Sequence, residues 1–208
     1  NKLKSLPDIS KICPSLQMFE CSDNFLTEFP KLPSGIVEVV LRNNKIKSLP
    51  VFASDYPNIK CIELDENEIS FLPPLPKNIM FLSIVNNKLE GISPSETPAL
   101  KKCTLEKNYL QKVPQFIKNS LEEISLKYNQ IKTMKGFIYS ENMSFIDLSS
   151  NKIEIIDPEL FKLPNLKVLM LCNNNIKNIP PEFSHAKALS NFNISMNPLE
   201  QFTIPVPM

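Results

Sequence analysis

The densest group of side chains that could bind a metal ion is the acidic stretch ELDENE, residues 63–68. Its carboxylates are oxygen ligands of the kind that Ca²⁺ prefers. Calcium loops of the Asp-x-Asp-x-Asp-Gly type, however, need a glycine at the turn, and this stretch has none. The sequence therefore predicts no metal site here, and Glu63, Asp65 and Glu66 are expected to be exposed surface residues.

Groups for nucleophilic catalysis or phosphate binding are scarce as well. The single histidine, His185, has no cysteine or serine constellation around it. The three glycines, Gly35, Gly91 and Gly136, are scattered, so they cannot form a phosphate-cradling loop. The sequence predicts no enzyme and no cofactor within these residues.

The cysteines indicate a compartment rather than a reaction. There are 5, an odd number, with no C-x-x-C motif and no paired cluster near either end. Cys21 and Cys103 fall at inward positions, Cys61 and Cys172 at outward ones, and Cys13 is expected to fill the back of the core. Free thiols are typical of reducing compartments, so a cytoplasmic location is expected.

The elements that carry these residues repeat along the chain. Residues 166–180 read L-x-x-L-x-L-x-x-N-x-I-x-x-I-P, and the same frame recurs in nine copies from Leu16 to Phe202. A half copy, with Asn1 and Leu3, precedes them. The aligned asparagines stand at positions 1, 24, 44, 67, 87, 108, 129, 151, 174 and 197. Their spacings, 20 to 23 residues, have the length of one supersecondary unit.

This frame resembles the leucine-rich repeat, and the resemblance covers essentially all 208 residues. It implies an α/β repeat solenoid, a curved right-handed coil. A parallel β-sheet would line the concave face, and extended, 3-10 or short helical returns would line the convex face. It also implies one domain over residues 1–208. Because Asn1 begins a return without the strand that should precede it, we expect a fragment of a longer protein.

The residue pattern supports this fold physically. The second and third leucine positions of the frame alternate as a strand requires, so both point to one face. The asparagine follows where the chain leaves the strand. Its amide both donates and accepts hydrogen bonds, so it can satisfy turn groups of its own coil and of the adjacent one. Asn108, Asn129 and Asn174 are therefore expected to be buried, whereas Asn173 and Asn175 are expected to be ordinary turn residues.

The segments that lead from one strand back to the next, here called returns, differ in sequence. FPKLPSGI (29–36) and LPPLPKNI (72–79) carry a double Leu-Pro spacing that resembles the short repeats of secreted bacterial effectors, with extended backs. IDPELFKLPNL (156–166) and IPPEFSHAKAL (179–189) resemble longer repeats with a helical turn. We therefore expect tighter curvature from residue 143 onward than over residues 24–87.

The composition restricts the class of partner. The net charge is +1, from 23 basic and 22 acidic residues, which gives no electrostatic reason to expect nucleic acid. No apolar run approaches the roughly 18 residues of a membrane span. A protein partner remains, since solenoids generally bind through the exposed face of their sheet.

The candidate binding residues are those between the core positions of the strands. Single charges there are also typical of a solvated face, but exposed apolar groups carry a solubility cost unless they are used. The strongest patch is expected at Phe145, Val168 and Met170. The full candidate set is Glu63, Asp65, Glu66, Phe81, Val85, Lys102, Lys107, Lys127, Tyr128, Phe145, Val168 and Met170.

The leading hypothesis is an intracellular signalling module that binds a protein on its concave face. Three alternatives stay open: a bacterial effector acting on host proteins, a regulatory domain attached to a catalytic domain outside these residues, and an extracellular receptor domain. The free cysteines and the absence of disulfide-bonded caps argue against the last.

Overall fold

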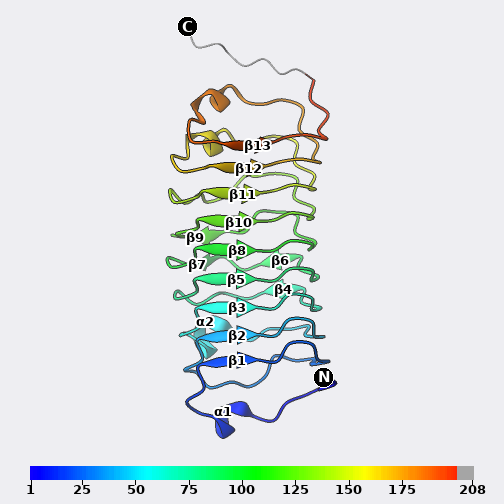
Figure 1. Ribbon diagram of the computed structural model, residues 1–208, viewed down its shortest axis with the longest axis vertical. Coiled ribbons are helices and arrows are strands. Elements are labelled where there is room, and N and C mark those ends of the chain that lie inside the picture. The colour runs from blue at the N-terminus through cyan, green and yellow to red at the C-terminus, as the bar shows by residue number, and fades with distance from the viewer. Residues whose placement is uncertain (201–208) are drawn as a thin grey trace.

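The protein is a stack of coils that share one long parallel sheet. The computed structural model describes residues 1–200, so Phe202, the last position of the predicted frame, lies outside them. Within that range nine strands pair in the order β1-β2-β3-β5-β8-β10-β11-β12-β13 (Figure 1). Their bounds are Met18–Glu20, Glu38–Val40, Cys61–Glu63, Phe81–Ser83, Lys102–Thr104, Glu123–Ser125, Phe145–Asp147, Val168–Met170 and Asn191–Asn193. Each of the nine predicted copies supplies one strand.

The register of the sheet follows the repeat frame. Every neighbouring pair is parallel and aligns equal positions of two copies, as Phe145 with Val168 and Lys102 with Glu123. Each position of the frame therefore forms a straight row across the sheet. This alignment makes a residue's neighbours readable from the sequence once the frame is known.

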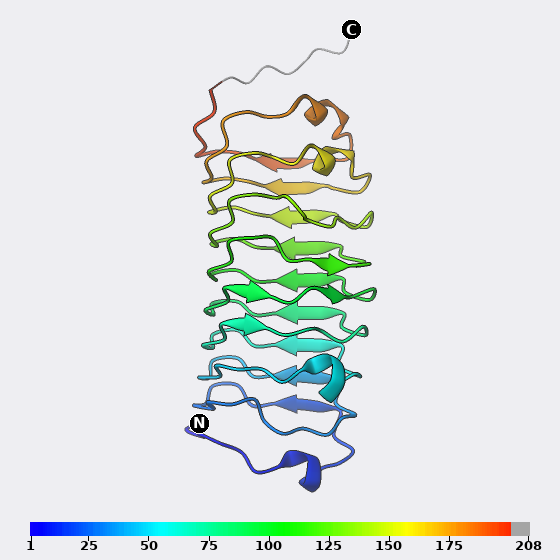
Figure 2. The same cartoon turned by 180° about the vertical axis from the view of Figure 1, so that it is seen from behind.

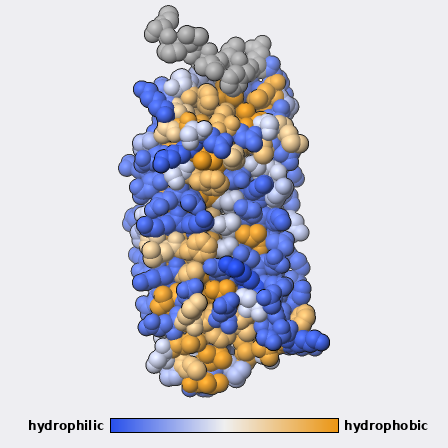
Figure 3. All heavy atoms as spheres, in the orientation of Figure 1, coloured by the Kyte–Doolittle hydropathy of each residue, from blue (hydrophilic) through white to orange (hydrophobic). Residues whose placement is uncertain are grey.

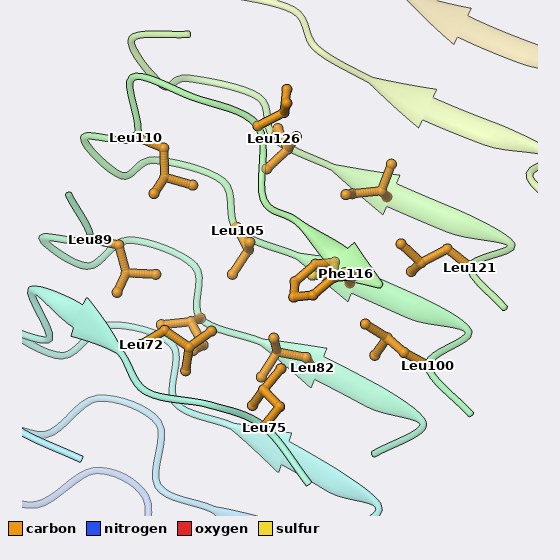
Figure 4. Packing of buried hydrophobic residues seen from close by; sticks show 14 of the residues in the cluster. Leu72, Leu75, Leu82, Leu89, Leu100, Leu105, Leu110, Phe116, Leu121 and Leu126 are labelled. Carbon is orange, nitrogen blue, oxygen red and sulfur yellow. The ribbon is translucent and has the colours of Figure 1, made fainter. Parts of the chain in front are cut away.

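The apolar positions of the frame form one continuous core. Leu82, Leu105 and Leu126 have no exposed surface, and Figure 4 shows such side chains stacked between the strands and the returns behind them. Burying a leucine fully is worth about 1.5–3 kcal/mol relative to leaving it exposed. One coil cannot bury its apolar side alone, so the stack is the unit of stability.

The asparagines form the predicted ladder along the edge where the strands end. In Asn108, the Oδ1 atom accepts a hydrogen bond from the Leu89 N–H of the preceding coil, 2.9 Å away. Its Nδ2 atom donates to the carbonyls of Ile84, Leu105 and Glu106 at 2.8, 3.2 and 3.1 Å. The acceptor bond recurs at the eight other ladder asparagines from Asn24 to Asn197. The ladder closes each turn and joins it to its neighbour.

The residue before each ladder asparagine has a left-handed backbone, which the sequence analysis did not anticipate. Its φ lies between 50° and 57° in all nine turns, at Asp23, Asn43, Glu66, Asn86, Lys107, Tyr128, Ser150, Asn173 and Met196. Such a φ costs a residue with a side chain roughly 1–2 kcal/mol. We infer that turning the asparagine amide inward requires this kink.

The length of a repeat decides how its return is built. The four asparagine spacings of 23 residues (1 to 24, 44 to 67, 151 to 174 and 174 to 197) each contain one helical turn. These turns are α1 (Ile9–Ile12), α2 (Phe52–Asp55) and two 3-10 helices, Pro158–Lys162 and Pro181–His185. In the described residues the shorter repeats have extended returns. Three of these returns carry four short strands, which pair as β4 (Phe71–Leu72) with β6 (Gly91–Ile92), and β7 (Ser95–Glu96) with β9 (Phe116–Ile117).

These returns line the side opposite the main sheet, as Figure 2 shows. The helical turns predicted within residues 156–166 and 179–189 are confirmed, and so are the extended backs at 29–36 and 72–79. The helix α2 was not expected. It places one helical back inside residues 24–87, which weakens the reason given for a curvature contrast, and the contrast itself stays a prediction.

The ladder gives a stability prediction. Replacing Asn174 with alanine removes the acceptor of the Ile153 N–H and the donor to the Leu148 carbonyl, at 2.9 and 3.0 Å, and both bonds are buried. An unsatisfied buried group costs about 1–3 kcal/mol. We expect chemical denaturation to show at least that loss for Asn174→Ala.

The neighbouring asparagines are the matched controls. Asn175→Ala should change the free energy of unfolding by less than about 0.5 kcal/mol, because this side chain is exposed. Asn173→Ala should fall between the two, since Asn173 is exposed but occupies the left-handed position. Equal losses at Asn174 and Asn175 would contradict the ladder.

Candidate binding surface

The face of the main sheet that points away from the core, here called the open face, carries the candidate residues. Figure 1 views the molecule from this side. The space-filling view in the same orientation shows hydrophobic residues gathered along the middle and hydrophilic residues along both sides (Figure 3). The face therefore offers an apolar strip with polar borders, the arrangement common at protein interfaces.

The predicted residues fall into three groups on this surface. Glu63, Phe81, Lys102, Phe145, Val168 and Met170 lie in the strands. Asp65, Val85 and Lys127 follow two residues after a strand ends. Glu66, Lys107 and Tyr128 lie in the left-handed turns at the border, so their prediction as residues of the strand face needs correction.

The acidic side chains of the first strands are engaged within the molecule. Glu63 forms an ion pair with Arg42, and the Arg42 Nε atom lies 3.9 Å from Asp65. Asp65 also accepts hydrogen bonds from the Ser83 hydroxyl and the Val85 N–H at 2.6 and 2.7 Å. Asp65 therefore helps to hold the next coil in place, a contact between coils that the sequence analysis missed.

The lysines of the middle strands are paired too. Lys102 Nζ lies 2.7 Å from Glu123, and Lys101 Nζ lies 3.3 Å from Glu122. Lys127 Nζ sits 5.0 Å from the centre of the Tyr128 ring, a cation–π contact. Lys102 is exposed, so its ion pair contributes about 0–1 kcal/mol to stability. These pairs neutralise much of the charge that the sequence places here.

The predicted apolar patch is assembled as expected. Phe145 and Val168 are aligned neighbours on adjacent strands, and Met170 lies two residues farther along β12. All three are half-buried, and Cys172 continues the line. Phe81 lies four strands away from Val168 in the same row and beside Lys102, so it does not join this patch.

A shallow hollow of about 540 Å³ opens beside the patch, between β8, β10 and β11. We call it the central hollow. Six open-face residues line it: Lys102, Thr104, Glu106, Glu123, Ser125 and Phe145. The sequence analysis did not select Thr104 and Ser125, because it searched for charged and apolar side chains. The available signal was the run of small residues at one frame position, Ser83, Thr104 and Ser125.

The cysteines occupy a range of environments, and all five are free. Cys103 is buried in the core, and burial raises the pKa of its thiol well above the ordinary value. Burial also raises the pKa of Cys61, and the nearby Glu38 carboxylate adds to the rise. Cys13 is exposed, so its expected place in the core is wrong. It follows α1, a helix that buries none of its own side chains.

Two searches of residues 1–200 gave negative results. None of the helices there has the length and apolar character to cross a membrane. Over the same residues, no three side chains among histidine, cysteine, aspartate and glutamate are grouped to hold a metal ion.

The hydrogen bonds of Asp65 give a second stability prediction. Asp65→Ala should destabilise the array by about 1–3 kcal/mol in denaturant titration, because the Val85 N–H loses its acceptor. Glu66→Gln, one residue away and exposed, is the control and should change stability by less than about 0.5 kcal/mol. Similar values for the two variants would show that Asp65 is only a surface charge.

Sequence comparisons match parts of this chain to a family profile and to segments of longer proteins. Residues 141–199 match the family profile described as Leucine rich repeat. Osteomodulin of Bos taurus is 34% identical over 92 residues, which are 40% of this chain and 21% of osteomodulin. Keratocan of Mus musculus is 33% identical over 99 residues, 44% of this chain and 28% of keratocan. Adenylate cyclase of Schizosaccharomyces pombe is 30% identical over 88 residues, 42% of this chain and 5% of the cyclase. The chain thus covers less than a third of each of these relatives.

Solved structures share the architecture. YopM from Yersinia enterocolitica WA-314 superposes with a TM-score of 0.75 at 22% identity, covering 95% of this chain and 41% of YopM. The plant peptide hormone receptor RGFR1, solved in complex with RGF2, gives 0.73 at 21% identity over 92% of this chain and 34% of the receptor. At such identities the likeness is one of fold. The repeat frame, the matched segment and the shared architecture together show that this chain folds as a leucine-rich-repeat solenoid.

Proposed function

We propose that this array is a recognition module whose open face binds another protein. The observation that carries the proposal is the half-buried apolar patch of Phe145, Val168 and Met170 on a face whose charges are largely paired with one another. Apolar side chains at the centre with polar side chains at the rim are typical of interfaces. Leucine-rich-repeat domains in general serve as scaffolds for protein interaction, and RGFR1 and Toll were solved with the partners RGF2 and Spatzle.

The charge pairs favour the apolar patch over the acidic strands as the centre of binding. Glu63 and Asp65 already have partners inside the molecule, so a protein ligand would have to replace those contacts. Phe145, Val168 and Met170 gain contacts on binding without such a loss. Methionine beside an aromatic ring also adapts its shape readily to a partner.

The compartment and the wider role belong to the same proposal. Five free cysteines support a reducing environment, and hence an intracellular signalling role. In this proposal the residues themselves carry out no reaction. A regulatory domain attached to a catalytic domain is the second candidate, and the similarity to a segment of an adenylate cyclase supports it.

The effector alternative rests on a different kind of observation. The extended double Leu-Pro returns and the likeness to YopM are both features of the backbone architecture. Architecture leaves the partner open, so this alternative uses the same open face and differs only in where the protein acts.

Two substitutions test the patch. Phe145→Ala and Met170→Ala should each weaken binding of a captured partner by more than about 1 kcal/mol, roughly fivefold in Kd, as interface anchors do. Partners would be captured with the wild-type array and identified by mass spectrometry, and their affinities measured by calorimetry. Thermal melting should show little change, because both side chains lie outside the core cluster.

The control is an exposed apolar residue outside the open face. Ile155, 76% exposed in a return segment, offers Ile155→Ala with a comparable loss of apolar surface. This variant should bind normally. If both patch variants bind normally while Glu63→Lys or Lys102→Glu abolishes binding, the charged residues form the site and the proposed centre is wrong.

A further inference from the structure

The central hollow exists because one row of the open face is built from small side chains. Thr104 and Ser125 are aligned partners on β8 and β10. Lys102, Glu123 and Phe145 form the adjacent row, and their long side chains rise beside the small ones. A short row between longer side chains leaves a trough, which accounts for the shape of the hollow.

Of the two carboxylates that line the hollow, Glu106 and Glu123, only one has an ion-pair partner among the described residues. Lys102 is paired with Glu123 at 2.7 Å, so these two cancel. Lys127, the aligned neighbour of Glu106, is directed instead over the Tyr128 ring at 5.0 Å. Among the described residues, Glu106 forms no ion pair. The hollow therefore has a net charge of −1 from Lys102, Glu106 and Glu123 together.

The floor of the hollow holds an unsatisfied hydroxyl group. Ser125 is 92% buried, being 8% exposed. Its Oγ atom makes no hydrogen bond to any described residue. Buried polar atoms are normally hydrogen-bonded, and each exception needs an explanation. This oxygen has almost no exposed surface as the side chain stands, so a rotation of Ser125 about χ1 would present it to a donor group of a ligand in the hollow.

The dimensions of the hollow suit a long side chain. Glu106 follows β8, and Phe145 begins β11, which is two strands away. Along the strand direction the two residues are offset by four residues, because Phe145 is in register with Lys102. The chain stays extended to Glu106, because the Leu105 and Lys107 N–H groups donate backbone hydrogen bonds to the Ser125 and Lys127 carbonyls of the next coil. With strands about 4.8 Å apart and residues about 3.3 Å apart, their Cα atoms are separated by about 16 Å. Thr104 and Ser125 lie between them, and Asp147, which is aligned with Ser125 on β11, lies next to Ser125.

We propose that the central hollow receives an arginine side chain of the protein partner. This inference rests on the proposed function and names the chemistry of the recognition. The aliphatic stem lies against Phe145, and the guanidinium group passes over Ser125 to reach Glu106. Arginine carries five N–H donors on a planar group, so it can bond a carboxylate and a nearby hydroxyl together.

Other side chains fit the hollow less well. An aspartate or glutamate of the partner would meet Glu106 and could pair with Lys102 only by displacing Glu123. A lysine places a compact charge at Glu106 but lacks the flat fork that reaches a second acceptor. An apolar side chain would cover the Glu106 carboxylate without giving it a partner, which is costly.

Short peptides test the proposal on the whole chain. Acetyl-Gly-Arg-Gly-amide would be titrated into ¹⁵N-labelled protein, alongside peptides with citrulline, lysine or aspartate in place of arginine. The amide signals of residues 102–106 and 123–125 should move on addition of the arginine peptide. Citrulline has the same shape without the charge, and it should bind about fivefold more weakly or worse, because a charge-assisted bond is lost.

Variants that remove the same charge at different places distinguish binding in the hollow from attraction to the overall charge of the protein. Glu106→Gln should weaken the arginine peptide about fivefold, whereas Glu122→Gln removes the same charge outside the hollow and should change Kd less than about twofold. Lys102→Gln releases Glu123 and should strengthen binding, while Lys101→Gln should not. Ser125→Ala should reduce the preference for arginine over lysine.

Several results would overturn the inference. They are a preference for the aspartate peptide, equal binding of lysine and arginine, signal changes outside the hollow, or equal effects of Glu106→Gln and Glu122→Gln. Melting curves of each variant confirm that the fold is intact. These readouts need no natural partner, so failure here is distinct from failure of the Phe145 and Met170 substitutions to weaken partner capture.

Discussion

The side-chain amide of the ladder asparagine is the interaction on which the rest of this structure depends. Each turn leaves backbone donors and acceptors that the sheet cannot satisfy, and burial makes them expensive. One amide satisfies groups of two coils at once, as Asn108 does for Leu89 and Ile84. Because every coil is closed in the same way, the strands align position by position. That alignment sets which side chains are neighbours on the open face.

The sequence predicted the strands and the ladder because their cause is periodic. It missed the left-handed residue before each asparagine, since five of the nine, among them Glu66, Lys107 and Tyr128, are not residue types that favour this backbone. The hydrogen bonds of the asparagine outweigh that local preference. The sequence of a return partly predicted whether it is helical or extended, but the length of the repeat predicts this better. The helix α2 lies in a repeat of 23 residues whose sequence does not suggest a helix.

In the candidate site, too, the features that follow from the repeat frame were predictable and the others were not. The neighbours Phe145 and Val168 followed from the frame, and the register confirms that they are aligned. The engagement of Asp65 with Ser83 and Val85 did not follow from it, since that bond depends on the length and direction of one side chain. The central hollow was missed for a related reason. A hollow is made by what small residues leave empty, and a search for reactive or bulky side chains passes over Thr104 and Ser125.

On the open face, the residues proposed to bind a partner are not the residues that stabilise the fold, with the exception of Asp65. Changes at Lys102, Glu106 or Phe145 alter the surface offered to a partner while the core leucines and the ladder stay in place, because outward positions alternate with inward ones. Asp65 lies on the same surface but holds two groups of the next coil. Variation at Asp65 is therefore constrained by folding, whereas under the proposed function variation around the hollow would be constrained by the partner. A rigid sheet also loses little conformational entropy on binding, so a few unpaired groups such as Glu106 can decide which partner is selected.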